Sequence, residues 1–188
     1  MTEIKIRMAT EQDAKQLLNI YAPYITHTAI TFEYDVPSVE EFQNRIRNIQ
    51  KKYPYLVAER DGEILGYSYA HEFYGRAAYD WCVETTIYVK MDCKGQGIGK
   101  LLYQQLEELL KQMNIINLNS CIAYTEEEDE YLTNQSESFH RHFGYQLVGR
   151  FHKCGYKFDR WYDMIWMEKM IGEHSEKPDR VKSILEIL

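Results

Sequence analysis

The feature with the clearest chemical potential is a glycine-rich segment, 95–99, in which every second residue is glycine. It lies between an apolar run and an amphipathic one. Without a Cβ, glycines let the main chain approach a ligand closely, and a helix that follows presents free N–H groups and a partial positive charge. Lys90, Lys94 and Lys100 surround this turn in a chain with a net charge of −7. The pattern predicts an anion-binding turn; the alternative is a glycine turn that binds no ligand.

Two common phosphate-binding motifs do not fit the segment. A Walker loop requires a hydroxyl residue after its lysine, and Leu101 follows Lys100 here. A dinucleotide-binding fingerprint requires a third glycine where Lys100 stands. The glycine spacing alone therefore leaves the identity of the anion open.

Glu84 is the best candidate for proton transfer, because it lies within the otherwise apolar run 83–89. Desolvation there would raise the pKa of its carboxyl toward a value useful for a general base. An α-amino group has a reference pKa near 8, so a modest base suffices to free it near neutral pH. The alternative is a strand glutamate that is salt-bridged or points outward.

These candidates need a framework of alternating strands and helices. Thr10 and Ser38 each begin a capping pattern followed by apolar residues at helical spacing, and Asp61-Gly62 predicts a tight hairpin turn. A further helix follows the glycine turn, and Gly144 suits the end of a short one. The expected strands are 4–8, 55–59, 64–71, 79–89, 118–124, 145–151 and 161–167, and the short helix is 136–143.

The chain of 188 residues, 45% hydrophobic and 27% charged, is expected to form one domain over 1–172 with a polar tail at 173–188. Its negative charge disfavours nucleic acid and anionic membranes as partners. No run approaches a membrane span and the opening is unlike a signal peptide, so we expect a cytoplasmic protein. Four scattered cysteines lack a C-x-x-C pair, which predicts reduced thiols and no metal site; Cys82 and Cys121 are expected to be buried. The acidic run 126–130 is interpreted as a solvated loop or a gate against anionic substrates.

Several motifs carry a family resemblance. K-G-Q-G-I-G-K-L-L resembles the pyrophosphate loop of the GNAT N-acetyltransferase superfamily, with Lys94 where that family has Gln or Arg. I-R-M-A-T-E-Q-D-A, W-C-V-E-T-T-I-Y-V and S-E-S-F-H-R-H-F-G-Y resemble its first strand, central strand and last helix. More narrowly, the chain is similar to the phosphinothricin acetyltransferase branch at Thr31-Phe32, 76–79, 83–85, Phe139-His140 and 155–161. The resemblance extends over about residues 4–170, nearly the whole domain.

The resemblance implies an α/β GNAT fold, with a mixed central sheet of about six to seven strands flanked by helices. It implies acetyl-CoA as the co-substrate, with pantetheine pairing along the end of the central strand and the pyrophosphate wrapped by the glycine turn. The residues expected to contact acetyl-CoA are Ile87, Tyr88, Val89, Lys94, Gly95, Gln96, Gly97, Ile98, Gly99, Lys100 and Ser136.

The same resemblance assigns the chemistry. Glu84 matches the branch's acidic residue on the central strand, and His140 stands where a proton donor for the leaving thiolate is expected. The alternative for His140 is a helix histidine that is only hydrogen-bonded or exposed. The acceptor is expected to contact Phe32, Tyr74, Arg76 and Tyr79, with Arg76 clamping a carboxylate or phosphinate. The implied reaction is direct acetyl transfer, in a ternary complex, to a small amino-acid-like amine such as phosphinothricin or methionine sulfoximine.

One departure and two alternatives remain. The branch has Asn three residues before the serine of its last helix, whereas Thr133 stands there and Asn134 comes one residue late. A cofactor contact from this segment is therefore open. The acceptor could instead be a polyamine, an antibiotic or a protein N-terminus, or the chain could be a non-catalytic acyl-CoA sensor. Aromatic residues near the C-terminal strands favour a homodimer.

Overall fold

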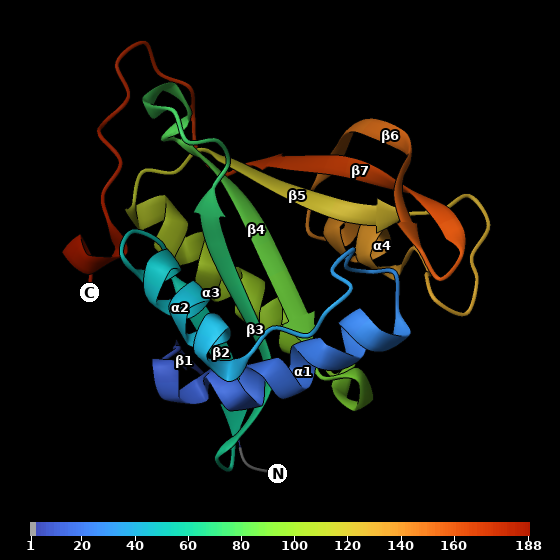
Figure 1. Ribbon diagram of the computed structural model, residues 1–188. Helices are drawn as coiled ribbons and strands as arrows, with labels where there is room; N and C mark the ends of the chain where they lie inside the picture. Colours follow the sequence, from blue (N-terminus) through green and yellow to red (C-terminus); the bar gives the residue numbers. More distant parts are fainter. Residues whose placement is uncertain (1–2) are drawn as a thin grey trace. The chain divides into compact units, whose positions relative to one another are not determined.

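The computed structural model describes residues 3–188, which fall into two compact units. Unit 1 comprises the segment that ends at Tyr21 together with Pro37–Leu118 and Met170–Leu188, and unit 2 comprises Ala22–Val36 and Asn119–Lys169. The seven strands follow the order β1-β2-β3-β4-β5-β7-β6 in one mixed sheet, drawn in Figure 1 with its helices. This architecture confirms the predicted α/β class and strand number.

The elements follow the expected sequence along the chain. The strands are β1 Lys5–Met8, β2 Tyr55–Arg60, β3 Glu63–Glu72, β4 Cys82–Val89, β5 Asn117–Tyr124, β6 Gln146–Lys157 and β7 Arg160–Met170. The helices are α1 Ala14–His27, α2 Val39–Gln50, α3 Ile98–Gln112 and α4 Gln135–His142, with short 3-10 turns at Glu11–Asp13, Ala77–Tyr79, Met91–Cys93 and Ile184–Glu186.

Both predicted helix starts have the expected capping interactions. The Asp13 carboxylate accepts the Thr10 N–H at 2.7 Å, and the Ser38 hydroxyl oxygen accepts the Glu41 N–H at 3.1 Å. These contacts satisfy donors that the first turn of a helix leaves without partners. The Ser38 cap thereby fixes the start of α2, and the Thr10 contacts fix the 3-10 turn Glu11–Asp13 that leads into α1.

In unit 1, strands β1 to β4 pair antiparallel in chain order. Asp61 and Gly62 form the β2–β3 turn with positive φ angles of 54° and 81°, as predicted. One face of the sheet carries tyrosines packed against α2, where Phe42 meets Tyr67 edge-on with 6.3 Å between ring centroids. The other face packs on α3, from which the Tyr103 hydroxyl reaches Thr85. Side chains of β4 therefore alternate between a tyrosine-lined face and the α3 face.

In unit 2, β6 and β7 form a hairpin beside a small core of Ala29, Ala123, Leu132 and Tyr162. The strands are longer than expected because the pairing shifts between Phe151 and Gly155, which obscures the apolar alternation in the sequence. The turn consists of Phe158 and Asp159, both with positive φ. Phe158 is held there by stacking on Tyr131, with 4.2 Å between ring centroids.

Three local expectations were wrong. The strand expected from Tyr79 begins at Cys82, because Ala77–Tyr79 forms a 3-10 turn. Cys121 is exposed, since it occupies the outward position of an otherwise buried stretch of β5, and Cys82 is only partly buried.

Among residues 3–188, no helix is long and apolar enough to cross a membrane.

The C-terminal segment is anchored to unit 1. The Trp81 indole N–H donates to the Asp179 carbonyl at 2.8 Å, and the Lys182 N–H donates to the Met113 carbonyl at 2.9 Å. Ile184 is completely buried, and its N–H donates to the Lys52 carbonyl. The polar segment therefore runs along the same unit that carries β1–β4.

Candidate active site

Glu84 points from the tyrosine-lined face of β4, directly opposite His71 on β3 in the strand register. Its Oε2 lies 3.7 Å from His71 Nε2, and its side chain is 22% exposed. Burial raises the pKa of the Glu84 carboxyl, and a charged His71 would lower it in part. Within residues 3–188 the carboxylate accepts no hydrogen bond, which leaves its oxygens open to a substrate.

Sequence reasoning missed His71. The predicted hairpin 55–71 placed this residue at the end of a strand, but its partner across the next strand depends on a register that the sequence does not fix. Side chains alternate along each strand, so Tyr69 and His71 share one face of β3, and Glu84 and Thr86 share one face of β4. Once the pairs His71–Glu84 and Tyr69–Thr86 are known, all four side chains lie on the same face of the sheet.

The glycine-rich turn leads from β4 into α3, as predicted. Gly95 and Gly97 have φ angles of 77° and 81°, a left-handed conformation that favours glycine. Gly97 is the N-cap of α3 and supplies no side-chain oxygen. A Cβ at either glycine would meet nothing within 4 Å, so the main chain is open on that side. The first N–H groups of α3 are therefore available to an anion.

The lysines around this turn differ. Lys90 pairs with Glu63 at 2.6 Å and with Asp92 at 3.4 Å, so its charge is largely compensated. Burial lowers the pKa of Lys94. The expected positive field near the turn therefore depends on Lys94 and Lys100 more than on Lys90.

The predicted acceptor residues of unit 1 lie together in the loop between β3 and β4. Tyr74 and Tyr79 are exposed and their ring centroids lie 5.6 Å apart. Arg76 begins the short turn that ends at Tyr79, whose N–H donates to the Arg76 carbonyl. Within the described part of the chain, the exposed Arg76 guanidinium has no acidic partner. It is thus free to pair with an anion.

His140 lies in α4 of unit 2 and is only 3% exposed. Its Nδ1 lies 2.7 Å from the Ser136 carbonyl, which can only accept, so Nδ1 carries the proton. Burial lowers the pKa of His140 to about 4. At pH 7 the ring is neutral, and its one N–H is used within the helix. This state does not provide the charged imidazolium expected of a donor to a thiolate.

Phe32, the remaining predicted acceptor residue, packs against the small core of unit 2. Its ring lies on Gly155 of β6 so closely that a Cβ at Gly155 would overlap the ring. Lys157, which is 3% exposed, donates to the Thr31 carbonyl at 2.7 Å and holds the segment before Phe32.

The acidic run in unit 2 is a structured loop. Asp129 accepts the N–H groups of Tyr131 and Leu132, each at 2.8 Å, and pairs with Arg160. Asn134 donates to the Thr125 carbonyl at 2.8 Å and accepts the Thr125 N–H at 3.3 Å. These bonds close the loop, while Glu126, Glu127, Glu128 and Glu130 stay exposed, as expected of a solvated loop.

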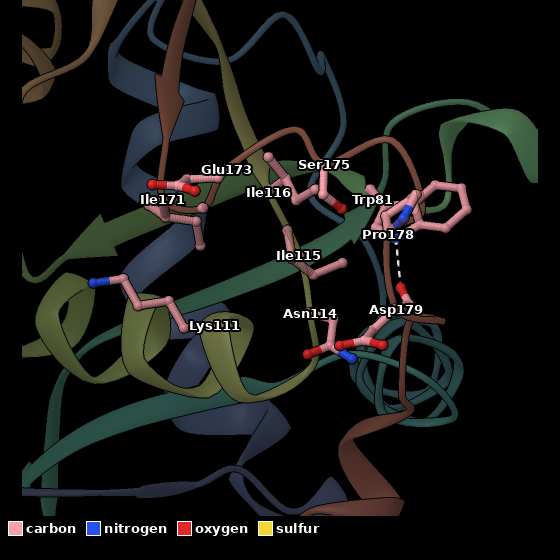
Figure 2. A pocket seen from close by; sticks show the side chains of 11 residues that line it. Trp81, Lys111, Asn114, Ile115, Ile116, Ile171, Glu173, Ser175, Pro178 and Asp179 are labelled. Carbon is pink, nitrogen blue, oxygen red and sulfur yellow. Dashed lines mark hydrogen bonds between the residues drawn. The ribbon is translucent and has the colours of Figure 1, made fainter.

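A separate cavity of about 220 Å³ opens beside the C-terminal segment of unit 1, and Figure 2 shows the side chains that line it. Trp81, Lys111 and Asn114 contribute to its wall with Glu173 and Asp179. It contains none of the predicted site residues.

Among residues 3–188, no group of three or more His, Cys, Asp or Glu is arranged to hold a metal ion.

The chain belongs to the acetyltransferase (GNAT) domain family, whose pattern it matches over residues 6–166. It is 32% identical over 171 residues to a phosphinothricin N-acetyltransferase of Streptomyces coelicolor, covering 89% of this chain and 96% of that protein. It is 30% identical to an L-methionine sulfoximine/L-methionine sulfone acetyltransferase of Pseudomonas aeruginosa, with coverages of 87% and 92%.

A solved structure gives the same family. A GNAT phosphinothricin acetyltransferase from Sinorhizobium meliloti, in complex with AcCoA, aligns with a TM-score of 0.85 at 31% identity, covering 95% of this chain and 94% of that one. The predicted GNAT fold and family resemblance are therefore confirmed.

Proposed function

We propose that this chain transfers the acetyl group of acetyl-CoA to the primary amine of a small amino-acid-like acceptor. Relatives named for phosphinothricin and for methionine sulfoximine or sulfone support this acceptor class. The observation that carries the proposal is the Glu84 carboxylate, which lies on the strand that leads into the glycine turn. It is a partly buried base that accepts no hydrogen bond from residues 3–188.

The proposed chemistry is direct transfer in a ternary complex. Glu84 takes a proton from the acceptor's ammonium, directly or through one water, and the free amine attacks the thioester carbonyl carbon. A C–N bond forms, the C–S bond breaks, and coenzyme A leaves as the thiolate. The raised pKa of Glu84 favours this role, because a base gains strength as its pKa approaches the working pH.

For the donor, we propose that pantetheine runs along Ile87, Tyr88 and Val89 and that the pyrophosphate lies on the glycine turn. Support comes from the open main chain at Gly95 and Gly97 and from the uncapped start of α3. The other proposed contacts to acetyl-CoA are Lys94, Gln96, Ile98, Gly99, Lys100 and Ser136.

For the acceptor, we propose that Arg76 binds a carboxylate or phosphinate while Tyr74, Tyr79 and Phe32 form apolar walls. The exposed guanidinium of Arg76, which has no acidic partner among residues 3–188, supports this assignment, since two parallel N–H donors match such an anion. For His140, the neutral ring bonded to Ser136 favours the hydrogen-bonded interpretation over that of thiolate donor, and we propose the donor role only as an alternative to be tested.

Incubation with acetyl-CoA and a panel of amines tests the proposal. The panel contains phosphinothricin, methionine sulfoximine, methionine sulfone, a polyamine, an aminoglycoside and a peptide with a free N-terminus, and release of coenzyme A is measured. We expect turnover with the first three. Turnover confined to another amine would overturn the acceptor class, and acetyl-CoA binding without any turnover would identify a sensor.

We further propose a homodimer formed through unit 2. The outermost strand, β6, exposes the apolar side chains of Leu147, Val148 and Phe151, each more than half accessible, and a long apolar edge strand is usually covered. Sedimentation of the chain and of Phe151→Glu tests this, with dimer expected for the first and monomer for the second.

Free cysteines support a reducing compartment, and we propose the cytoplasm. We keep 1–172 as the proposed catalytic domain and 173–188 as a tail that braces it.

A further inference from the structure

The hydrogen-bond state of His71 is set by its own backbone neighbourhood. Nδ1 lies 2.9 Å from the Glu72 carbonyl oxygen, which can only accept, so Nδ1 carries a hydrogen. In the neutral ring Nε2 then has a lone pair, and this atom is the one that faces Glu84 Oε2 at 3.7 Å. Two acceptors face each other across this gap, and one added proton would convert their repulsion into attraction.

Few other groups act on this pair. Tyr69 lies on β3, with its ring centroid 6.0 Å from that of His71, and it interacts electrostatically with Glu84 on β4. Burial raises the pKa of Tyr69 to about 12, so its hydroxyl stays neutral, and the Thr86 side chain is hydrogen-bonded to it. From α1 and α2, Tyr21 and Arg45 interact electrostatically with Tyr69. Glu72 contributes its carbonyl to His71, and among residues 3–188 it is the charge of His71 that acts on the Glu84 carboxyl.

The side chains of His71 and Glu84 differ in their exposure to solvent, and this difference favours release of a proton from His71. The His71 side chain is 36% exposed and that of Glu84 is 22% exposed. The His71 side chain is therefore more open to solvent than the Glu84 side chain. The separation of 3.7 Å is only slightly longer than a hydrogen bond, so a small side-chain rotation brings the two atoms into direct contact.

We propose that His71 is a positioning residue that completes the base: it accepts from Glu84 the proton taken from the acceptor and passes it to solvent. The proposal rests on the proposed function. The proton moves from the ammonium nitrogen to Glu84 Oε2, then to His71 Nε2 directly or through water, and finally to bulk water. Charge balances because Glu84 returns to the carboxylate as His71 becomes an imidazolium, which then returns to neutral.

The test is the pH dependence of kcat for wild type and His71→Gln, a substitution that keeps polarity and size but cannot titrate. Without the cationic partner, Glu84 should hold its proton to higher pH, so the acid limb should move up by about half a pH unit or more. The loss in kcat should be about threefold or more at pH 6 and small at pH 8.5, with the acetyl-CoA KM unchanged. His142→Gln, which removes an exposed imidazole in α4, should leave the profile as it is.

A measurement without turnover separates this proposal from the proposed function. With ¹³C-labelled glutamate, the carboxyl resonance of Glu84 is titrated in both proteins, and His71→Gln should raise its midpoint. Equal midpoints and superimposable pH profiles would overturn the coupled pair. If no amine is acetylated but the midpoint still moves, the proposed function fails and the coupling between His71 and Glu84 stands.

Discussion

Glu84 in unit 1 is partly buried and His140 in unit 2 is buried, and burial has opposite consequences for the chemistry of these two ionisable side chains. Desolvation disfavours the charged form of each. For Glu84 this raises the pKa and makes the carboxylate a stronger base. For His140 it lowers the pKa to about 4 and removes the proton that an acid would need. Burial therefore strengthens Glu84 as a general base and removes the charged form that His140 would need as a general acid.

The largest expected effect comes from removing the base. Glu84→Gln keeps the shape of the side chain and should lower kcat near pH 7 by about 10²–10⁴, the usual range for a general base. The deficit should narrow as the pH rises past the pKa of the amine, because solvent then supplies the free amine. Acetyl-CoA affinity should stay near wild type. A variant equally impaired at every pH would end the assignment of Glu84 as base.

The donor half of unit 1 is tested at Gly97. Gly97→Ala should lower acetyl-CoA affinity at least about tenfold, or about 1.4 kcal/mol, because a Cβ would occupy the open side of the turn. Gly62→Ala is the matched control, since Gly62 has the same φ of 81° and equally open surroundings in the β2–β3 turn. It should show a similar strain in thermal unfolding but normal binding by calorimetry. Equal loss of affinity in both variants would refute the pyrophosphate assignment.

The acceptor half is tested at Arg76. Arg76→Lys keeps the charge but loses the two-pronged donor geometry, so the acceptor KM should rise by about tenfold while the acetyl-CoA KM hardly moves. Arg47→Lys, in an ion pair with Glu11 on the surface, provides the control for an arginine-to-lysine change. A parallel rise in both Michaelis constants would mean that Arg76 supports the fold.

The smallest kinetic effect is expected at His140. His140→Asn keeps an N–H that can reach the Ser136 carbonyl, so kcat at pH 7 should fall by less than about fivefold, whereas loss of a working general acid would cost about 10² or more. A loss of that larger size would restore His140 as the thiolate donor and break the contrast with Glu84.

Stability offers an independent check on His140. The folded protein keeps this histidine neutral down to a pKa of about 4, whereas the unfolded chain protonates it near its ordinary value of 6.5. Between these values the unfolded state binds more protons, so the contribution of His140 to stability is present above pH 6.5 and is lost as the pH falls toward 4. Chemical unfolding at several pH values should show a shallower decline for His140→Asn.

Sequence reasoning worked where local patterns determine the structure. The capping residues Thr10 and Ser38, the Asp61-Gly62 turn and the glycine-rich turn each act through their own few neighbours. It failed where distant segments meet. The pairing of His71 with Glu84 depends on the β3–β4 register, and the neutrality of His140 depends on how its helix packs. The closed acidic loop likewise depends on Arg160 and Tyr162 of β7.

The contact between Phe32 and Gly155 has a consequence for how this chain can vary. The ring occupies the space that any side chain at position 155 would need. A larger residue at 155 therefore has to be matched by a smaller one at 32, and the two positions should covary among relatives that keep this loop. Pairs such as Gly with Phe and Ala with Leu are expected, while Ala with Phe should be rare. Acceptor preference, if Phe32 lines that site, would then change through paired substitutions.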